Sequence, residues 1–257
     1  MGVTFGSVLR RGALAGVLAG LAAAVVIWLV VEPVIRRALV IEDLRGVHGG
    51  QSAPVGLVAH GGDEPLVSRA TQVVGGAVTA VIVGVAVGVI FAVVFARVRD
   101  RLPGRGDFGR SMVLAVVGFA AVSLLPAVKI PSNPPAVGDP GTVGRRTMLY
   151  AVVLLLGVAI AVVLPALDRW LAGRGRTVPT RWALDTVAGV LLVVLVLAVV
   201  PGSPDQVPAD VPAAVIWDFR LASLAQLATM WLTIGLVFGL LMERVAAPER
   251  ALEPVAA

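Results

Sequence analysis

Six long apolar stretches, separated by polar segments, dominate the pattern of this 257-residue chain. Each stretch runs for about 18 to 24 residues, and a helix needs about 20 residues to cross the hydrocarbon layer of a membrane. Open sheet edges and irregular backbone cannot face lipid, so all six are expected to be helices. The pattern predicts an all-α, polytopic membrane helix bundle, a single domain over residues 1–257. The predicted spans are Gly12–Val31, Val73–Ala96, Ser111–Val128, Thr147–Leu167, Ala183–Val200 and Leu221–Met242.

Basic residues predict the orientation of these spans. With the N-terminus inside, thirteen of the 21 lysines and arginines fall on the inner side, mostly in short loops. The other eight are spread over much longer outer segments, so the charge distribution favours an N-in, C-in topology. Ser111–Val128 and Ala183–Val200 are short for a span, and a five-span arrangement stays open at this point.

Composition excludes several classes of protein and of binding site. With 58% hydrophobic and 14% charged residues, the chain is an integral membrane protein. It has no cysteine, which excludes disulfides and thiolate metal sites. No basic, aromatic-interleaved patch suggests nucleic-acid binding, and no nucleotide-binding or hydrolase motif suggests an enzyme. If the chain moves a solute across the membrane against its concentration gradient, the energy would then come from an ion gradient or a partner subunit.

The segment Lys129–Arg146, which reads KIPSNPPAVGDPGTVGRR, interrupts the apolar pattern between the third and fourth spans. Four prolines, together with Asn, Asp and Gly at turn positions, predict a shaped loop. The predicted topology places this Pro-rich segment outside. Asn133 and Asp139 are candidate oxygen donors at its centre, and Pro134 biases Asn133 to an extended backbone. Lys129, Arg145 and Arg146 would fold the loop, since cationic side chains repel a metal ion.

The chain's two histidines, His48 and His60, both lie in the first outer loop, near Glu42. Imidazole and carboxylate groups suit divalent first-row metals, so these three residues are candidate metal ligands. Their spacing matches no recognised ligand motif. Solvated loop residues are the alternative interpretation.

Other polar groups lie in or beside the last two spans. Gln226 falls on a polar face of span six, which could line a path or hydrogen-bond to another helix. Asp218 and Arg220 lie at the outer mouth of that span, where Arg220 is expected to bond carbonyls or an outer-loop carboxylate. Asp185, near the inner start of span five, is expected to pair with Arg181 one turn earlier.

Three motifs resemble the CbtA family, membrane subunits assigned to cobalt uptake. The Pro-rich segment is similar to that family's KxPxNPPAVGDPxTxGxRT loop. Val67–Gln72 looks like its VSRxxQ entry to the second span. The last span resembles the family's closing pattern of WxFRxxSL and GxxFG, carried here by Trp217–Leu224, Gly235, Phe238, Gly239, Glu243 and Arg244.

The resemblance implies a bacterial cell-membrane subunit for uptake of Co²⁺ or a related divalent metal, with no tightly bound cofactor. It also implies about five spans and a small single-span partner protein with a His-rich tail. Membrane lipids are the other expected partner, and a homo-oligomer stays open. External loops would collect the ion and the bundle would carry it. A non-transporting scaffold subunit is the alternative, because the spans lack charge at their centres.

Overall fold

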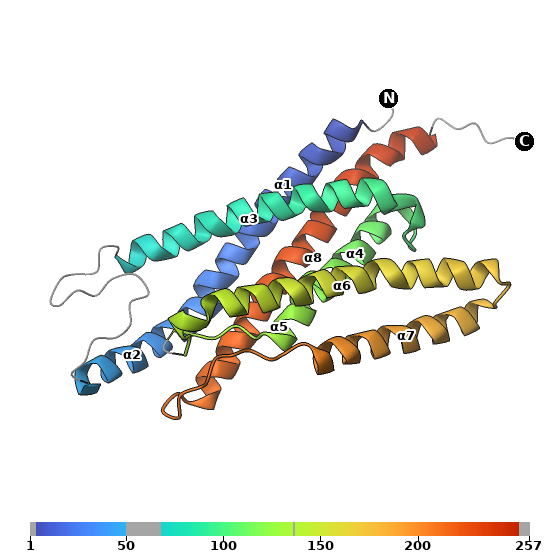
Figure 1. The fold of residues 1–257 in the computed structure, drawn as a ribbon. Helices are drawn as coiled ribbons and strands as arrows, with labels where there is room; N and C mark the ends of the chain where they lie inside the picture. The colour runs from blue at the N-terminus through green and yellow to red at the C-terminus, as the bar shows by residue number, and fades with distance from the viewer. Residues whose placement is uncertain (1–3, 50–67, 136, 252–257) are drawn as a thin grey trace, which may run out of the picture. The chain divides into compact units, whose positions relative to one another are not determined.

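The structure is a computed structural model that describes residues 4–49, 68–135 and 137–251. Within these ranges it is helical and contains no strand. Most helices run on from one another, so several numbered elements belong to one span. The elements, shown in Figure 1, are α1 (Phe5–Val26), the π-helix η1 (Ile27–Val31), α2 (Glu32–Gly49), α3 (Arg69–Val98), the 3₁₀-helix η2 (Arg99–Arg101), α4 (Gly106–Gly118), the π-helix η3 (Phe119–Leu124), α5 (Leu125–Lys129), the 3₁₀-helix η4 (Pro140–Thr142), α6 (Val143–Gly173), α7 (Val178–Val199) and α8 (Ala213–Ala251).

Six helical stretches of the described chain are long and apolar enough to cross a membrane, which confirms the six-helix prediction. The two stretches that were short in sequence are now 24 residues (Gly106–Lys129) and 22 residues (Val178–Val199) long. They gain length because polar residues at their ends are also helical. The predicted fourth span, Thr147–Leu167, likewise extends to Pro140–Gly173.

Two prolines explain the two π-helices. Pro33 and Pro126 lie inside continuous helical stretches, where a proline removes one backbone N–H and crowds the carbonyl four residues before it. Those carbonyls belong to Leu29 in η1 and Val122 in η3. A π-turn widens the helix at that carbonyl, so each stretch continues through its proline without ending.

The chain divides into two compact units, and each is described by itself. Unit 1 comprises residues 1–34, 57–116 and 221–257. Here α1 packs against α3 through small residues, and a Cβ added to Gly16 or Gly88 would meet backbone of the other helix. Phe238 of α8 packs edge-on against Phe91 and Phe95 of α3, with ring centroids 5.4 and 5.1 Å away. The first turn of α1 and the last turns of α8 lie at the same end of this unit (Figure 1).

Unit 2 comprises residues 35–56 and 117–220. In this unit α6 and α7 form an antiparallel hairpin (Figure 1), and α5 packs beside α6. Gly157 of α6 lies directly against the backbone of Ala121. The buried core joins α5, α6 and α7 through Leu125, Ile130, Leu149, Val153, Val196 and Val200. This core positions the Pro-rich segment, because that segment connects α5 to α6.

Candidate functional site

The Pro-rich segment is shorter as a loop than the sequence predicts. Lys129 is the last residue of α5, and α6 already begins at Val143, so Arg145 and Arg146 are helical. Asp139 explains the early start of the helix. Its Oδ1 accepts a hydrogen bond from the Gly141 amide at 2.8 Å, and Pro140 follows at the first helical position. A capping carboxylate and a proline at that position are both typical of a helix N-terminus.

Asp205, in the connection between α7 and α8, organises this loop. Its side chain is fully buried (0% exposed). The Asp205 Oδ2 atom accepts from Asn133 Nδ2 at 2.9 Å and from Arg146 Nη1 at 2.6 Å. Its Oδ1 atom accepts from the Thr142 hydroxyl at 2.5 Å. Three residues of the Pro-rich segment thus converge on one carboxylate, and with Arg220 they are called the Asp205 network below.

The charge state of Asp205 follows from these contacts. Burial raises the pKa of a carboxyl group, because the charged form loses its hydration. Hydrogen bonds from Thr142 and Asn133, and the positive charge of Arg146, outweigh that effect, so the pKa of Asp205 lies below its usual value of 3.8. Asp205 is therefore ionised at neutral pH, and its negative charge is already matched by Arg146.

Asn133 connects the Asp205 network to the start of α8. While its amide nitrogen binds Asp205, its Oδ1 accepts from Arg220 Nη2 at 3.1 Å. The prediction for Arg220 was a bond to carbonyls or to an outer-loop carboxylate, and its partner is the side-chain carbonyl of Asn133. The Nε atom of Arg220 is buried and has no hydrogen-bond partner in the described ranges. Two residues earlier, Asp218 forms an ion pair with Arg37 of α2 at 3.0 Å, at a partly exposed position.

The remaining predicted residues of the segment hold it against its neighbours. Lys129 Nζ donates to the carbonyl of Leu197, in the last turn of α7, at 2.7 Å. A lysine at that position satisfies a helix-end carbonyl and matches the negative end of the helix dipole. Pro134 is buried, and Val137 packs with Val211 and Ile216. Arg145, in contrast, is exposed.

The predicted metal ligands are not gathered in the part of the chain that the structure describes. Glu42 is exposed on α2. His48 lies in the last turn of α2, its side chain outside the described part, and His60 lies outside the described residues altogether. The described residues contain no group of three or more histidine or acidic side chains that could hold a metal ion. Gln226 is partly buried on α8, in unit 1.

Comparison with known proteins decides the family. A family model described as a probable cobalt transporter subunit, CbtA, matches residues 5–243 of the chain. The chain belongs to the CbtA family. No curated protein and no solved structure matches it. The family is described as one of transporter subunits, and together with the six apolar helices it indicates a multi-pass membrane protein.

The CbtA resemblance in Val67–Gln72 now has a physical explanation. Ser68 caps α3 by accepting from the Thr71 amide at 3.3 Å. Arg69 binds both carboxylate oxygens of Glu32 and also donates to Gln72 Oε1 at 2.8 Å. Glu32 is 4% exposed, directly after the π-helix η1. The motif therefore closes an ion pair between α2 and α3 within unit 1.

The closing pattern of the CbtA family is also explained by packing in unit 1. The Ser111 hydroxyl donates to the carbonyl of Gly235 at 2.7 Å, and a Cβ on Gly239 would lie 3.0 Å from the Phe108 backbone. The Glu243 carboxylate accepts from the Phe108 amide at 3.1 Å and so caps α4. These residues position α8 against α4.

The predicted pairing of Asp185 with Arg181 is only part of the arrangement. Arg181 binds both carboxylate oxygens of Asp168 across the α6–α7 hairpin. Asp185, on the same helix as Arg181, attracts it electrostatically without a hydrogen bond. The Oδ1 atom of Asp185 is buried with no hydrogen-bond partner among the residues described. Arg181 can face Asp168 because the two helices run antiparallel from a short turn, and a planar guanidinium fits a carboxylate with two parallel bonds.

Sequence reasoning missed three buried carboxylates: Asp205, Glu32 and Asp107, the last of which Arg99 binds through both oxygens. Asp205 lies in an acidic segment with Asp210 and Asp218, a composition that by itself indicates no role for any one of them. Its partners lie 59 to 72 positions away, so no local spacing could reveal them. Glu32 lies just past the predicted end of span one. An acid that follows a long apolar run and precedes a proline was the available signal.

Proposed function

We propose that this CbtA-family chain is the membrane-spanning subunit of an uptake system for Co²⁺, or for a related divalent metal, in a bacterial cell membrane. The observation that carries the proposal is the family match over residues 5–243. The six apolar helices support it, because a polytopic helix bundle can enclose a path whose backbone groups are satisfied within the protein. Cobalt is the cargo of this subunit.

First capture of the ion is assigned to His48, His60 and Glu42. Imidazole nitrogen and carboxylate oxygen are ligands that first-row divalent metals accept. The exposed position of Glu42 on α2 supports this role.

Asp139 is assigned as an oxygen donor at the mouth of the path. Its side chain is exposed, and one of its oxygens already holds the Gly141 amide. An ionised carboxylate has about four acceptor positions, so the group retains capacity for a cation. Arg145 and Arg146 keep their assigned role of shaping the loop, which the contact between Arg146 and Asp205 supports.

Asn133 is a conditional donor in this proposal. Its amide oxygen accepts from Arg220, so the guanidinium must withdraw before that oxygen can bind a metal. Arg220 would then control access to Asn133, and Gln226 would serve later, inside the bundle. The family's description as a subunit supports a partner, here assigned as a small single-span protein with a His-rich tail.

Uptake of radioactive cobalt into proteoliposomes tests the function. Vesicles contain the purified chain, either alone or with the His-rich partner, and empty vesicles provide the baseline. We expect cobalt accumulation above the baseline, greater when the partner is present. Accumulation equal to the baseline in both preparations would contradict transport and leave the scaffold interpretation.

The variant Asp139→Asn tests the assigned donor. Asparagine also caps a helix start, so the loop should keep its shape while losing one negative charge. We expect the cobalt concentration for half-maximal uptake to rise by about fivefold or more, on the order of 1 kcal/mol. The matched control is Asp100→Asn, which removes a carboxylate that is 94% exposed in unit 1. Equal uptake curves for the two variants would exclude Asp139 as a donor.

A further inference from the structure

The end of the α6–α7 hairpin carries a cluster of arginines beside two exposed tryptophans. We propose that this cluster, made of Arg169, Trp170, Arg174, Arg176 and Trp182, binds the phosphate headgroup of an anionic phospholipid. The proposal concerns a lipid site in unit 2 and does not depend on which metal is transported.

The charge of the hairpin end is positive and accessible. Residues 168–185 contain four arginines and two aspartates. Arg181 is occupied by Asp168, in a two-pronged ion pair. Arg169, Arg174 and Arg176 are exposed. Arg174 and Arg176 lie in the turn and Arg169 lies near the end of α6. Basic residues at a membrane surface attract anionic lipids by about 1 kcal/mol each, so the three together favour an anionic headgroup here.

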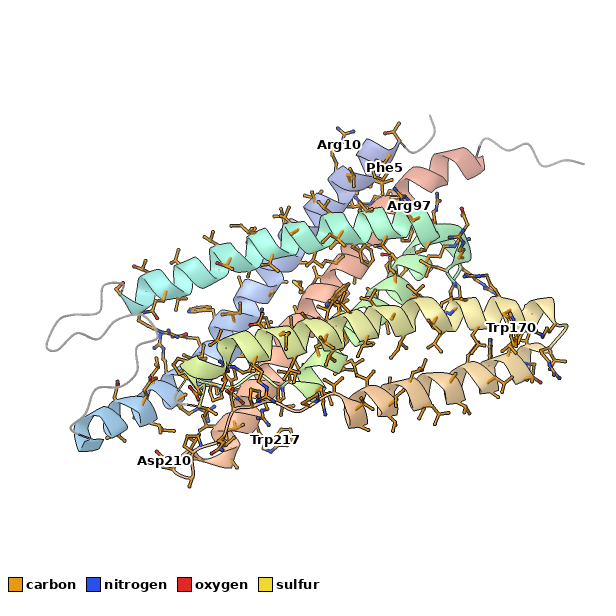
Figure 2. The ribbon with its side chains drawn as sticks, viewed as in Figure 1. Phe5, Arg10, Arg97, Trp170, Asp210 and Trp217 are labelled. Atoms are coloured by element: carbon orange, nitrogen blue, oxygen red, sulfur yellow. The ribbon has the colours of Figure 1, made fainter. Side chains whose placement is uncertain are left out.

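Two tryptophans place this charge at the depth of lipid headgroups. Trp170 is 55% exposed and Trp182 is 68% exposed, one on each helix of the hairpin. Figure 2 shows Trp170 close to the turn that joins them. Exposed tryptophans at the ends of spans are enriched at the membrane–water interface, where the ring contacts acyl chains and the N–H meets polar groups.

Arg174 is oriented by Trp170. The Arg174 guanidinium carbon lies 3.4 Å from the centre of the Trp170 ring, so the side chain stacks on the aromatic face. A stacked guanidinium keeps its charge and its edge N–H donors, and it loses less freedom on binding than an extended arginine. Its planar fork suits two phosphate oxygens.

The start of α7 adds backbone donors to the same place. The Thr177 side chain makes no capping bond to the α7 backbone; its hydroxyl instead lies 2.9 Å from that of Thr180. Pro179 has no N–H, so the donors of this first turn are the amides of Val178 and Thr180, and the positive end of the helix dipole points the same way. In the proposal these amides and the three arginines together hold one phosphate.

A phospholipid fits better than a soluble anion because apolar surface continues from these phosphate-binding groups. Val178, Leu184 and Val187 of α7 are 49, 43 and 56% exposed. Acyl chains attached to the bound headgroup can lie along this surface, whereas free phosphate gains nothing from it. The predicted topology places the hairpin end on the inner side, where it would meet the anionic lipids of the cytoplasmic leaflet.

Native mass spectrometry of the purified full chain tests the proposal, with phosphatidylglycerol and phosphatidylcholine titrated in detergent. We expect the first phosphatidylglycerol to bind at least tenfold more tightly than phosphatidylcholine. Changing Arg169, Arg174 and Arg176 to Gln should abolish this preference. The control triple variant changes Arg10, Arg97 and Arg101 to Gln, which removes the same charge from unit 1 and should keep the preference (Arg10 and Arg97 are labelled in Figure 2).

Two further measurements distinguish a lipid site formed by these particular residues from non-specific attraction between positive charge and anionic lipid. Trp170→Leu keeps every arginine and removes the stacking platform, so phosphatidylglycerol should bind about two- to fivefold more weakly. Inorganic phosphate at millimolar concentration should not displace the lipid. The proposal is overturned if both triple variants lose the preference equally, if Trp170→Leu binds as the parent does, or if inorganic phosphate competes. None of these readouts involves cobalt, so failure here leaves the proposed transport function unaffected.

Discussion

Asp205 shows how much a single side chain can determine. It is buried in a connection between two helices, yet it fixes a loop that lies far away in sequence. Removing one partner of a buried charge pair leaves the other without compensation, which costs more than the pair gains. Asp205 therefore has more influence on the loop than any residue within the loop itself.

The variant Asp205→Asn tests this influence. Asparagine retains the size of the side chain and removes the charge that Arg146 binds. We expect a loss of about 2 kcal/mol in the free energy of unfolding, the typical value of a hydrogen bond to a charged group. Unfolding of the purified chain in SDS, followed by circular dichroism, measures it. Asp100→Asn, at an exposed position, should change stability by less than about 0.5 kcal/mol.

The same residue predicts a pH dependence. The pKa of Asp205 is lower in the folded protein than its usual value of 3.8, so its ionised form is favoured by folding. Its contribution is fully present above about pH 5, where the unfolded chain is also ionised, and is lost as the pH falls through the lowered pKa. The difference in thermal midpoint between the parent and Asp205→Asn should be constant from pH 7 to pH 5 and shrink below pH 4. A difference that grows on acidification would contradict the assignment.

The contact partners of individual residues are what the sequence predicts least well. Asn133, Thr142 and Arg146 are recognisable because they belong to one continuous motif. Asp205 and Glu32 are not, because their partners are supplied by segments that meet only after folding. The same applies to Arg181, whose nearest acid in sequence, Asp185, is not the one that it binds. Charge pairing between helices depends on geometry that spacing along one helix does not contain.

At the level of helices, hydrophobic pattern is a better guide. All six spans were predictable because lipid requires long apolar runs. The ends of the spans were less predictable, since polar residues such as Asp139 extend helices beyond the apolar region. The presence of a proline does not by itself predict the π-helices near Pro33 and Pro126. Pro165 also lies inside a helix, and α6 stays a regular α-helix around it. Neighbouring packing decides how a helix accommodates each proline.

The contact between α1 and α3 predicts that alanine lowers the free energy of unfolding at one glycine and raises it at another. A Cβ at Gly16 would meet the backbone of Gly84 and Val85, whereas one at Gly76 would meet nothing within 4 Å. Gly16→Ala should lower the free energy of unfolding by about 1–3 kcal/mol through overpacking. Gly76→Ala should raise it by about 0.5–1 kcal/mol, because alanine favours helix. Unfolding in SDS measures both, and equal effects would refute the close contact.

For the whole molecule, the N-in, C-in topology stays a prediction that the cysteine-free chain makes easy to test. Gly173 ends α6 just before α7, and Gly202 follows the other end of α7. A Cβ at either glycine meets nothing within 4 Å. Cysteine at position 202 should react with a membrane-impermeant maleimide in intact cells. Cysteine at position 173 should react only after permeabilisation. The reverse pattern would invert the predicted topology, and with it the side of the membrane on which the Asp205 network lies.

The glycine contact between α1 and α3 has a mechanical consequence. If α1 turned by one residue about its own axis, a rotation of about 100° with a shift of about 1.5 Å, Val17 would replace Gly16 at a point where no side chain fits. The two helices therefore resist this screw motion and move together as one rigid part of unit 1. Movement during a transport cycle has to be accommodated at other joints, so cross-linking α1 to α3 should leave cobalt flux intact.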